Sequence, residues 1–241
     1  MKTPTLLIAA ALSLSAANAY AAGLPQSATL KYSGSYGIPA TMTFTRSGNQ
    51  YTIVSRIKVP MYSIRFESGG TISGNTLRPK YYKDVRGGKL YAEAKFSGNS
   101  ITYGKVGSSE TAKTGGTTLD LFTLAWQLAA NDARLPSGLN ITNGKKLYPV
   151  SGMTKVGSEN YKIGGGTTTV NKYRVKRGDD TVTYSFAPAF NNIPAEINYT
   201  DDGKTYDLKL TSAELDLLEA CIRSWGEVLY QEGICKPPVE V

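Results

Sequence analysis

The alternation of apolar and polar residues divides the chain into two similar regions. Residues 28–106 and 145–210 both consist of short runs rich in Thr, Tyr, Val, Ile and Phe, separated by turn signals. Several of these runs alternate apolar and polar side chains, which is typical of half-buried antiparallel strands. The sequence therefore predicts two antiparallel meanders.

Turn residues mark the ends of the predicted hairpins. The tripeptide Ser-Gly-Asn begins at Ser47, Ser73 and Ser97, each time between two strand-like runs. Gly and Asn tolerate the positive φ angles that tight hairpins need. We therefore predict three hairpin tips at these positions.

Between the two meanders lies one helical stretch, "TTLDLFTLAWQLAAND", which predicts a helix over residues 118–131. Its apolar residues fill most of the helix circumference. The polar residues form one narrow stripe, which consists of Asp120, Thr123, Gln127 and Asn131. We expect this stripe to face the open side of the sheet, toward solvent or a second helix.

Capping signals predict where two helices begin. Thr117 or Thr118 is the expected N-cap of the central helix, with Asp120 placed to favour its positive end. The later segment "TSAELDLLEACIRSW" has Ser212 as a plausible N-cap, acids in its first turns and apolar residues along one face. It predicts a second, C-terminal helix.

These elements predict a mainly β (α+β) fold. We expect a curved antiparallel sheet, or an open half-barrel of two meanders, wrapped around the central apolar helix. Residues 1–21 form the expected signal peptide, and residues 22–212 form one domain. Residues 213–241 form the expected C-terminal helix and a tail closed by a disulfide.

The first residues are typical of a cleavable secretory signal. Lys2 precedes an apolar run, and small residues follow that run in the pattern of a cleavage site. No Cys follows either candidate cleavage site, so a lipoprotein signal is not expected. We therefore expect a periplasmic protein that meets no nucleic acid.

The chain has two cysteines, Cys221 and Cys235, and no histidine. In an oxidising compartment such a close pair is most simply a disulfide. Its loop of about 15 residues would contribute roughly 3 kcal/mol of stability in the chain-entropy model.

The absence of histidine removes the commonest general base and the commonest metal ligand. The sequence also lacks a phosphate-binding loop, a dinucleotide fingerprint and a calcium loop. Glu67, which lies on a predicted strand among apolar neighbours, is the carboxylate of most interest, and an ion pair with Arg65 or Arg78 is its expected role. We expect a non-enzymatic protein without cofactor or metal.

Aromatic residues recur along the predicted strands and the central helix. Those that point inward could line an apolar ligand pocket, for which the candidates are Phe122, Trp126, Tyr62 and Phe66. The same side chains could equally pack into a solid core, which is the default for a domain of this size.

The formal net charge of +8 is unevenly distributed. Residues 145–177 contain eight Lys or Arg and one acid, Glu159. The candidate basic surface within this region consists of Lys172, Arg174, Lys176 and Arg177. Such a surface could meet anionic lipids or an envelope protein, or it could be an ordinary solvated strand face.

Several short motifs resemble those of an exported bacterial family, domain of unknown function 3108. They are the F-E-S-x-G pattern at Phe66, an L-x-P at Leu77, the Asp120-Leu121 pair, and a P-x-x-I that begins at Pro194. The resemblance covers roughly residues 28–210, with an abbreviated N-terminal strand pair, and it implies no known activity. The family also resembles, at the level of fold, periplasmic lipoprotein carriers and receptors, whose half-barrel encloses an apolar cavity.

These observations leave three functions open. The leading expectation is a non-enzymatic periplasmic protein that binds an apolar or amphiphilic, lipid-like ligand. The first alternative is a structural or interaction protein with a solid core that docks an anionic envelope partner through its basic face. The second alternative is a carboxylate-dependent hydrolase centred on Glu67.

Overall fold

A computed structural model describes residues 24–201 and 203–216 of the chain. The expected signal peptide, Cys221 and Cys235 lie outside the described residues. No helix within the described ranges is long and apolar enough to cross a membrane.

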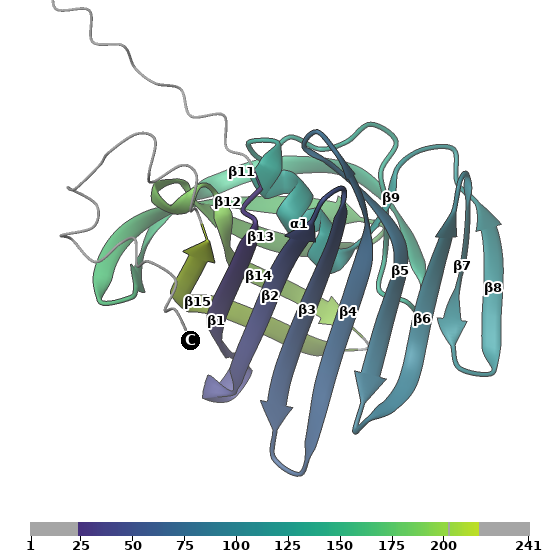
Figure 1. Cartoon of the computed structure of the whole chain (residues 1–241), viewed down its shortest axis with the longest axis horizontal. Coiled ribbons are helices and arrows are strands. Elements are labelled where there is room, and N and C mark those ends of the chain that lie inside the picture. Colours follow the sequence, from purple (N-terminus) through teal and green to yellow (C-terminus); the bar gives the residue numbers. More distant parts are fainter. Residues whose placement is uncertain (1–23, 202, 217–241) are drawn as a thin grey trace, which may run out of the picture.

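Within the described residues, fifteen strands form one antiparallel sheet around a single α-helix (Figure 1). The bounds of the strands are β1 Ser27–Gly34, β2 Pro39–Ser47, β3 Gln50–Val59, β4 Tyr62–Ser73, β5 Thr76–Arg86, β6 Lys89–Ser97, β7 Ser100–Lys105, β8 Ser108–Lys113, β9 Thr118–Asp120, β10 Asn140–Thr142, β11 Leu147–Ile163, β12 Gly166–Arg177, β13 Asp180–Ala187, β14 Ile193–Asp201 and β15 Lys204–Asp216. The helices are α1 Leu121–Ala130 and the 3-10 turns η1 Ser35–Gly37 and η2 Pro188–Phe190. The parallel pair β9–β10 is the exception to the antiparallel order.

The strand order is β8 to β1 followed by β15 to β9, so the first and last strands of the fold pair with each other. Strand β1 alternates buried and accessible residues as the sequence predicts, with Ala28, Leu30 and Tyr32 facing the core. The sheet curves until the amide of Gly104 on β7 donates to the carbonyl oxygen of Gly144, 2.8 Å away, in the loop after β10.

A close approach explains the glycine at this seam. Gly144 has a φ of +82°, and a Cβ atom there would lie 2.8 Å from the ring of Tyr82. A larger residue would be strained by its backbone angle and would push the loop away from β5. Gly144 therefore allows the two parts of the sheet to meet on the side opposite the β1–β15 pair.

The three predicted hairpin tips are confirmed. Gly48, Gly74 and Gly98 lie in the turns after β2, β4 and β6, and their φ angles are +57°, +58° and +54°. The Ser-Gly-Asn tripeptide marks these turns because its Gly adopts a positive φ without strain.

Helix α1 is shorter at its N-terminus than the sequence predicted. The expected start at residue 118 and the expected N-cap at Thr117 or Thr118 are wrong, because Thr118–Asp120 forms strand β9 against β10. Asp120 is the N-cap instead, and its Oδ1 accepts the amides of Phe122 and Thr123 at 3.1 and 3.0 Å. A side-chain carboxylate satisfies these amides better than a threonine hydroxyl can.

The predicted helix start at Ser212 is also wrong. Residues up to Asp216 continue strand β15, in which Ser212 pairs with Lys31 of β1 and Glu214 forms an ion pair with that lysine at 2.9 Å. The hydroxyl and acids that would suit a helix N-terminus thus lie in a strand, because residues 212–216 pair with β1 beyond a register shift at Lys31. The rest of the predicted C-terminal helix lies outside the described residues.

Candidate functional site

All ten residues of α1 are buried. The side chains that surround this helix therefore determine whether the interior of the fold has room for a ligand. The helix lies in the concave face of the sheet, between the strands β2–β5 in front and β13–β14 behind (Figure 1). Tyr184 of β13 fixes the rear side, because its hydroxyl donates to the carbonyl oxygen of Leu121 at 3.0 Å.

The polar stripe of α1 faces the sheet and not the open side, which corrects the expectation from the sequence. Asp120, Thr123 and Gln127 are 0%, 0% and 2% exposed, whereas Asn131 at the C-cap is partly exposed. Because the helix is enclosed on every side, its polar groups need partners on the strands and not in water.

Asp120 is the centre of this buried contact. Besides the two helix amides, its carboxylate accepts the hydroxyls of Ser68 at 2.9 Å and Thr123 at 2.6 Å. Burial raises the pKa of Asp120, and the four hydrogen bonds oppose that rise. The Thr123 hydroxyl lies 3.3 Å from that of Tyr51 on β3, which extends the contact to a second strand.

Gln127 joins the other end of the helix to the β4–β5 hairpin. Its Oε1 accepts the amide of Leu77 at 2.7 Å, and its Nε2 donates to the carbonyl oxygen of Asn75 at 2.9 Å. One side chain thus pairs two backbone groups that would otherwise be buried without partners.

Three of the family-like motifs meet at α1. The serine of F-E-S-x-G, Ser68, contacts the aspartate of the Asp-Leu pair, Asp120, and the leucine of L-x-P, Leu77, contacts Gln127. These motif residues are therefore accounted for by the attachment of the helix to the sheet, which is a structural role.

The four candidate pocket residues separate into two groups. Phe66, Phe122 and Trp126 lie inside the fold, and the rings of Phe66 and Phe122 are 5.2 Å apart. Tyr62 is 50% exposed at the start of β4, so the structure does not bring it to the other three.

Side chains of β2 occupy the space beside Trp126. Its ring lies 4.6 Å from that of Phe44, and its indole Nε1 donates to the sulfur of Met42 at 3.3 Å. Trp126 is 1% exposed, and Phe44 and Met42 are as deeply buried. This arrangement is that of a packed core around the ring.

The candidate basic surface is an outward row of three cations on β12. Lys172, Arg174 and Lys176 alternate with inward residues along the strand, and Arg174 and Lys176 are exposed. No described acid forms an ion pair with Arg174 or Lys176. Arg177 does not belong to this row, because it is completely buried, which corrects its place in the predicted surface.

Lys172 is the neutralised end of the row. Its ammonium lies 3.0 Å from Glu159 and 3.2 Å from Glu196, and Glu196 also accepts the hydroxyls of Tyr161 and Ser185 at 2.9 and 2.7 Å. Glu196 is only 3% exposed, so these contacts satisfy a buried carboxylate and fasten β11 over β13 and β14.

Arg177 and Arg86 are two arginines in contrasting environments. Arg86 forms a two-pronged contact with Asp84 at 2.8 and 3.1 Å, and its guanidinium lies 4.0 Å from the ring centre of Tyr91. The guanidinium carbon of Arg177 lies 4.5 Å from the ring centre of Tyr148 and 5.9 Å from that of Tyr199, and Arg177 has no carboxylate partner among the described residues. The sequence indicated neither environment directly.

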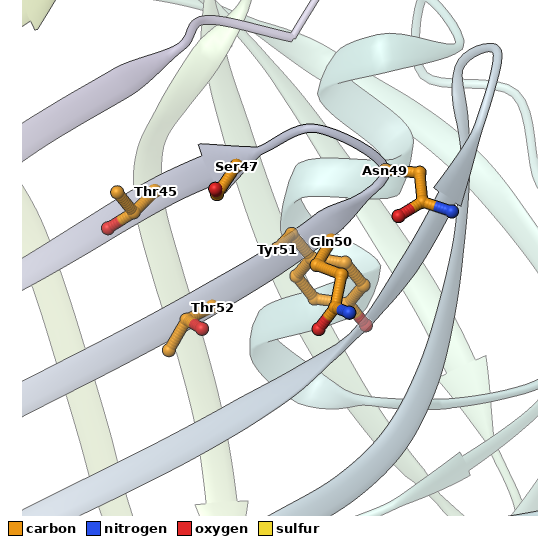
Figure 2. A pocket seen from close by; sticks show the side chains of 6 residues that line it. All are labelled: Thr45, Ser47, Asn49, Gln50, Tyr51 and Thr52. Atoms are coloured by element: carbon orange, nitrogen blue, oxygen red, sulfur yellow. The ribbon is translucent and has the colours of Figure 1, made fainter.

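A polar hollow of about 480 Å³ lies at the β2–β3 hairpin (Figure 2). Neutral side chains line it, namely Thr45, Ser47, Asn49, Gln50, Tyr51 and Thr52. Figure 2 shows these residues on the two strands and their turn, next to α1. The lining contains no carboxylate, amine or thiol, and its one titratable group is the hydroxyl of Tyr51, whose pKa burial raises above the ordinary value.

Glu67 lies on the outward face of β4 in a structural contact. It forms an ion pair with Arg65 at 3.3 Å, as the sequence predicted, and accepts the hydroxyl of Tyr81 at 3.1 Å. Burial raises the pKa of Tyr81, and the neighbouring Glu67 raises it further. Within the described ranges, no group of Asp and Glu side chains is arranged to hold a metal ion.

Comparisons with known proteins identify the family. No curated protein matches the sequence. One similar solved structure is described as "Crystal Structure of Beta-barrel-like Protein of Domain of Unknown Function DUF1849 from Brucella abortus", with 9% identity, a TM-score of 0.48, and coverage of 80% of this chain and 98% of that chain. The profile of the family described as "Protein of unknown function (DUF3108)" matches residues 29–211, which is most of the chain. The chain therefore belongs to the DUF3108 family, as its motifs indicated.

Proposed function

We propose that this protein is a non-enzymatic interaction protein of the bacterial cell envelope that docks on an anionic membrane surface through the β12 row. The observation that carries the proposal is the pair Arg174 and Lys176, which are exposed on one strand face and have no ion-pair partner among the described residues. Two such cations attract lipid phosphates with about 1 kcal/mol each.

The packed environment of Trp126 supports this choice over the carrier function. Met42 and Phe44 already contact the ring, so the part of the interior where a lipid chain was expected is filled by the protein itself. A solid core around a pinned helix suits a rigid scaffold that presents a charged face.

Reversal of the row tests the proposal. The double substitution Arg174→Glu and Lys176→Glu is expected to weaken binding to phosphatidylglycerol vesicles by at least about tenfold, because it replaces two attractive charges by two repulsive ones. Co-sedimentation at low and high salt measures the effect, and binding should fall as salt rises.

A matched control distinguishes binding through the β12 row from binding that depends only on the net charge of the protein. Lys58→Glu with Lys113→Glu makes the same change in net charge on β3 and β8, where both lysines are exposed. This control should bind vesicles nearly as well as the wild type. Equal loss in both variants, or no binding by the wild type, contradicts docking through β12; retention of an acidic envelope protein by the wild type alone would identify a protein partner instead.

An amphiphile-binding protein is the second candidate function. The observation that favours it is the set of aromatic side chains inside the sheet at α1, among them Phe66 and Phe122 with rings 5.2 Å apart. Mass spectrometry of organic extracts from protein purified from its own compartment is expected to show a bound lipid if this function holds. A protein free of lipid that also takes up no fluorescent fatty acid excludes it.

A further inference from the structure

Arg177 is a buried cation that has no carboxylate partner among the described residues. Its side chain is 0% exposed, and its Nη2 donates to the carbonyl oxygen of Thr200 at 3.0 Å. Its Nε and Nη1 have no hydrogen-bond partner among the described residues. A buried charged donor without an acceptor is strongly destabilising. The contribution of Arg177 to folding therefore does not explain why an arginine occupies this position.

The strand pattern explains why Arg177 points inward. Val175 and Arg177 lie two residues apart at the end of β12 and share the buried face, whereas Lys176 between them is exposed. The cation therefore lies inside the curved sheet, next to Tyr148 at the start of β11 and Tyr199 near the end of β14. We call Arg177, Tyr148, Tyr199 and Tyr206 the arginine end.

The rings of Tyr148 and Tyr199 lie within cation–π distance of the guanidinium, but ring faces cannot neutralise its charge. Tyr199 stacks on Tyr206 with ring centres 5.0 Å apart, and Tyr148 lies 4.5 Å from the guanidinium carbon. Ring faces stabilise a cation by about 1–2 kcal/mol, but they accept none of the hydrogen bonds in the guanidinium plane. The N–H bonds of Nε and Nη1 lie in that plane and need oxygen acceptors.

Arg86 is an arginine of this fold that has both aromatic neighbours and a carboxylate partner. It is close enough to Tyr206 for the two groups to influence each other electrostatically, and it has Asp84 as a two-pronged partner. Arg177 has equivalent aromatic neighbours without the carboxylate. Among the described residues, the partner that Arg177 lacks and Arg86 has is therefore an anion.

We propose that Arg177 binds the carboxylate or phosphate group of a small ligand at the arginine end. Nη2 keeps one hydrogen beside its donation to Thr200, and this hydrogen together with that of either Nε or Nη1 can form a two-pronged contact with the ligand. Charge-assisted contacts of this kind are strong. Tyr148, whose ring centre lies 4.5 Å from the guanidinium carbon, is partly exposed, so the arginine end adjoins the protein surface at this residue. The inference does not depend on docking through β12, because it concerns the inward face.

The test uses the whole protein and four defined probes. Isothermal titration with dodecyl phosphate and dodecanoate below their micellar concentrations, and with inorganic phosphate and acetate, measures affinity for both sources of the anion. Dodecanol is the uncharged control. Binding of the alkyl anions alone identifies a lipid-like head group, and binding of the inorganic ions identifies a free anion; either result supports the site.

Three variants locate the binding. Arg177→Met is expected to lower anion affinity by about thirtyfold or more, because it removes the charged partner of a buried contact. Arg177→Lys keeps the charge but loses the planar fork, and it should also bind less tightly. Arg56→Met, on the exposed face of β3 and outside the β12 row, should bind as the wild type does.

Stability without ligand distinguishes a binding residue from a structural one. Arg177→Met should unfold at the wild-type temperature or above it, since an apolar chain replaces an unneutralised buried charge. If Arg177→Met does not fold, the comparison of Arg177→Lys with Arg56→Met decides. The proposal is overturned if no anion binds the wild type, or if the variants at position 177 bind anions as tightly as it does.

Discussion

Replacing Asp120 by alanine is expected to lower the free energy of unfolding by about 4 kcal/mol. The substitution removes the N-cap of α1 and leaves the amides of Phe122 and Thr123 and the hydroxyl of Ser68 without their acceptor inside the fold. Loss of a cap costs up to about 2 kcal/mol, and each unsatisfied buried donor adds about 1 kcal/mol or more. Chemical denaturation followed by tryptophan fluorescence measures the change.

The control for this substitution is Asp179→Ala. Asp179 is exposed in the turn between β12 and β13, so its loss should change stability by less than about 0.5 kcal/mol. If Asp120→Ala were as mild as this control, the buried network around the helix N-terminus would not be what attaches α1 to the sheet.

The pKa of Asp120 adds a pH dependence whose sign can be checked. Burial raises its pKa in the folded protein above the ordinary value of 3.8, despite the hydrogen bonds. As pH rises through the window between these two pKa values, the unfolded chain loses the proton first, so the stability contributed by Asp120 falls. Asp120→Asn should abolish this part of the pH dependence, which parallel denaturation series of both proteins would detect.

The strands were predictable because their signals are local. Alternating residues in β1 and the glycines after β2, β4 and β6 each report their own backbone conformation. The direction of the α1 stripe had no such local signal. The Oε1 of Gln127 accepts the amide of Leu77, which lies fifty residues earlier in the chain. An expectation based on hydrophobic periodicity alone places every polar stripe of a helix at the solvent, because it contains no information about such a distant partner.

Two of the other errors, at Ser212 and Arg177, have different physical origins. Ser212 and the acids after it fit a helix N-terminus, but pairing with β1 decides their conformation, and tertiary contacts commonly override such local preference. Arg177 was assigned by charge density, although its alternation with Lys176 and its match to Val175 already placed it on the other strand face. The alternation of side chains between the two faces of a strand was therefore the signal that could have separated Arg177 from the basic row.

Trp126→Ala is expected to lower the free energy of unfolding by about 3–5 kcal/mol, the usual cost of removing a large aromatic side chain from a core. The substitution removes the ring contact with Phe44 and the hydrogen bond to Met42, and the surrounding strands cannot close the whole gap. Tyr62→Ala is the matched control, because that half-exposed ring should contribute about 1 kcal/mol or less.

Uptake of an apolar probe by the Trp126→Ala variant separates the two candidate functions, because the two functions predict opposite changes in uptake. If the interior is a solid core, the wild type takes up no apolar probe, and Trp126→Ala gains uptake because a dry cavity lined by apolar side chains binds small apolar molecules. If the protein is a carrier, the wild type binds the probe and Trp126→Ala loses affinity. Since Met42 and Phe44 already fill the space beside the indole, we expect a gain of uptake in the variant.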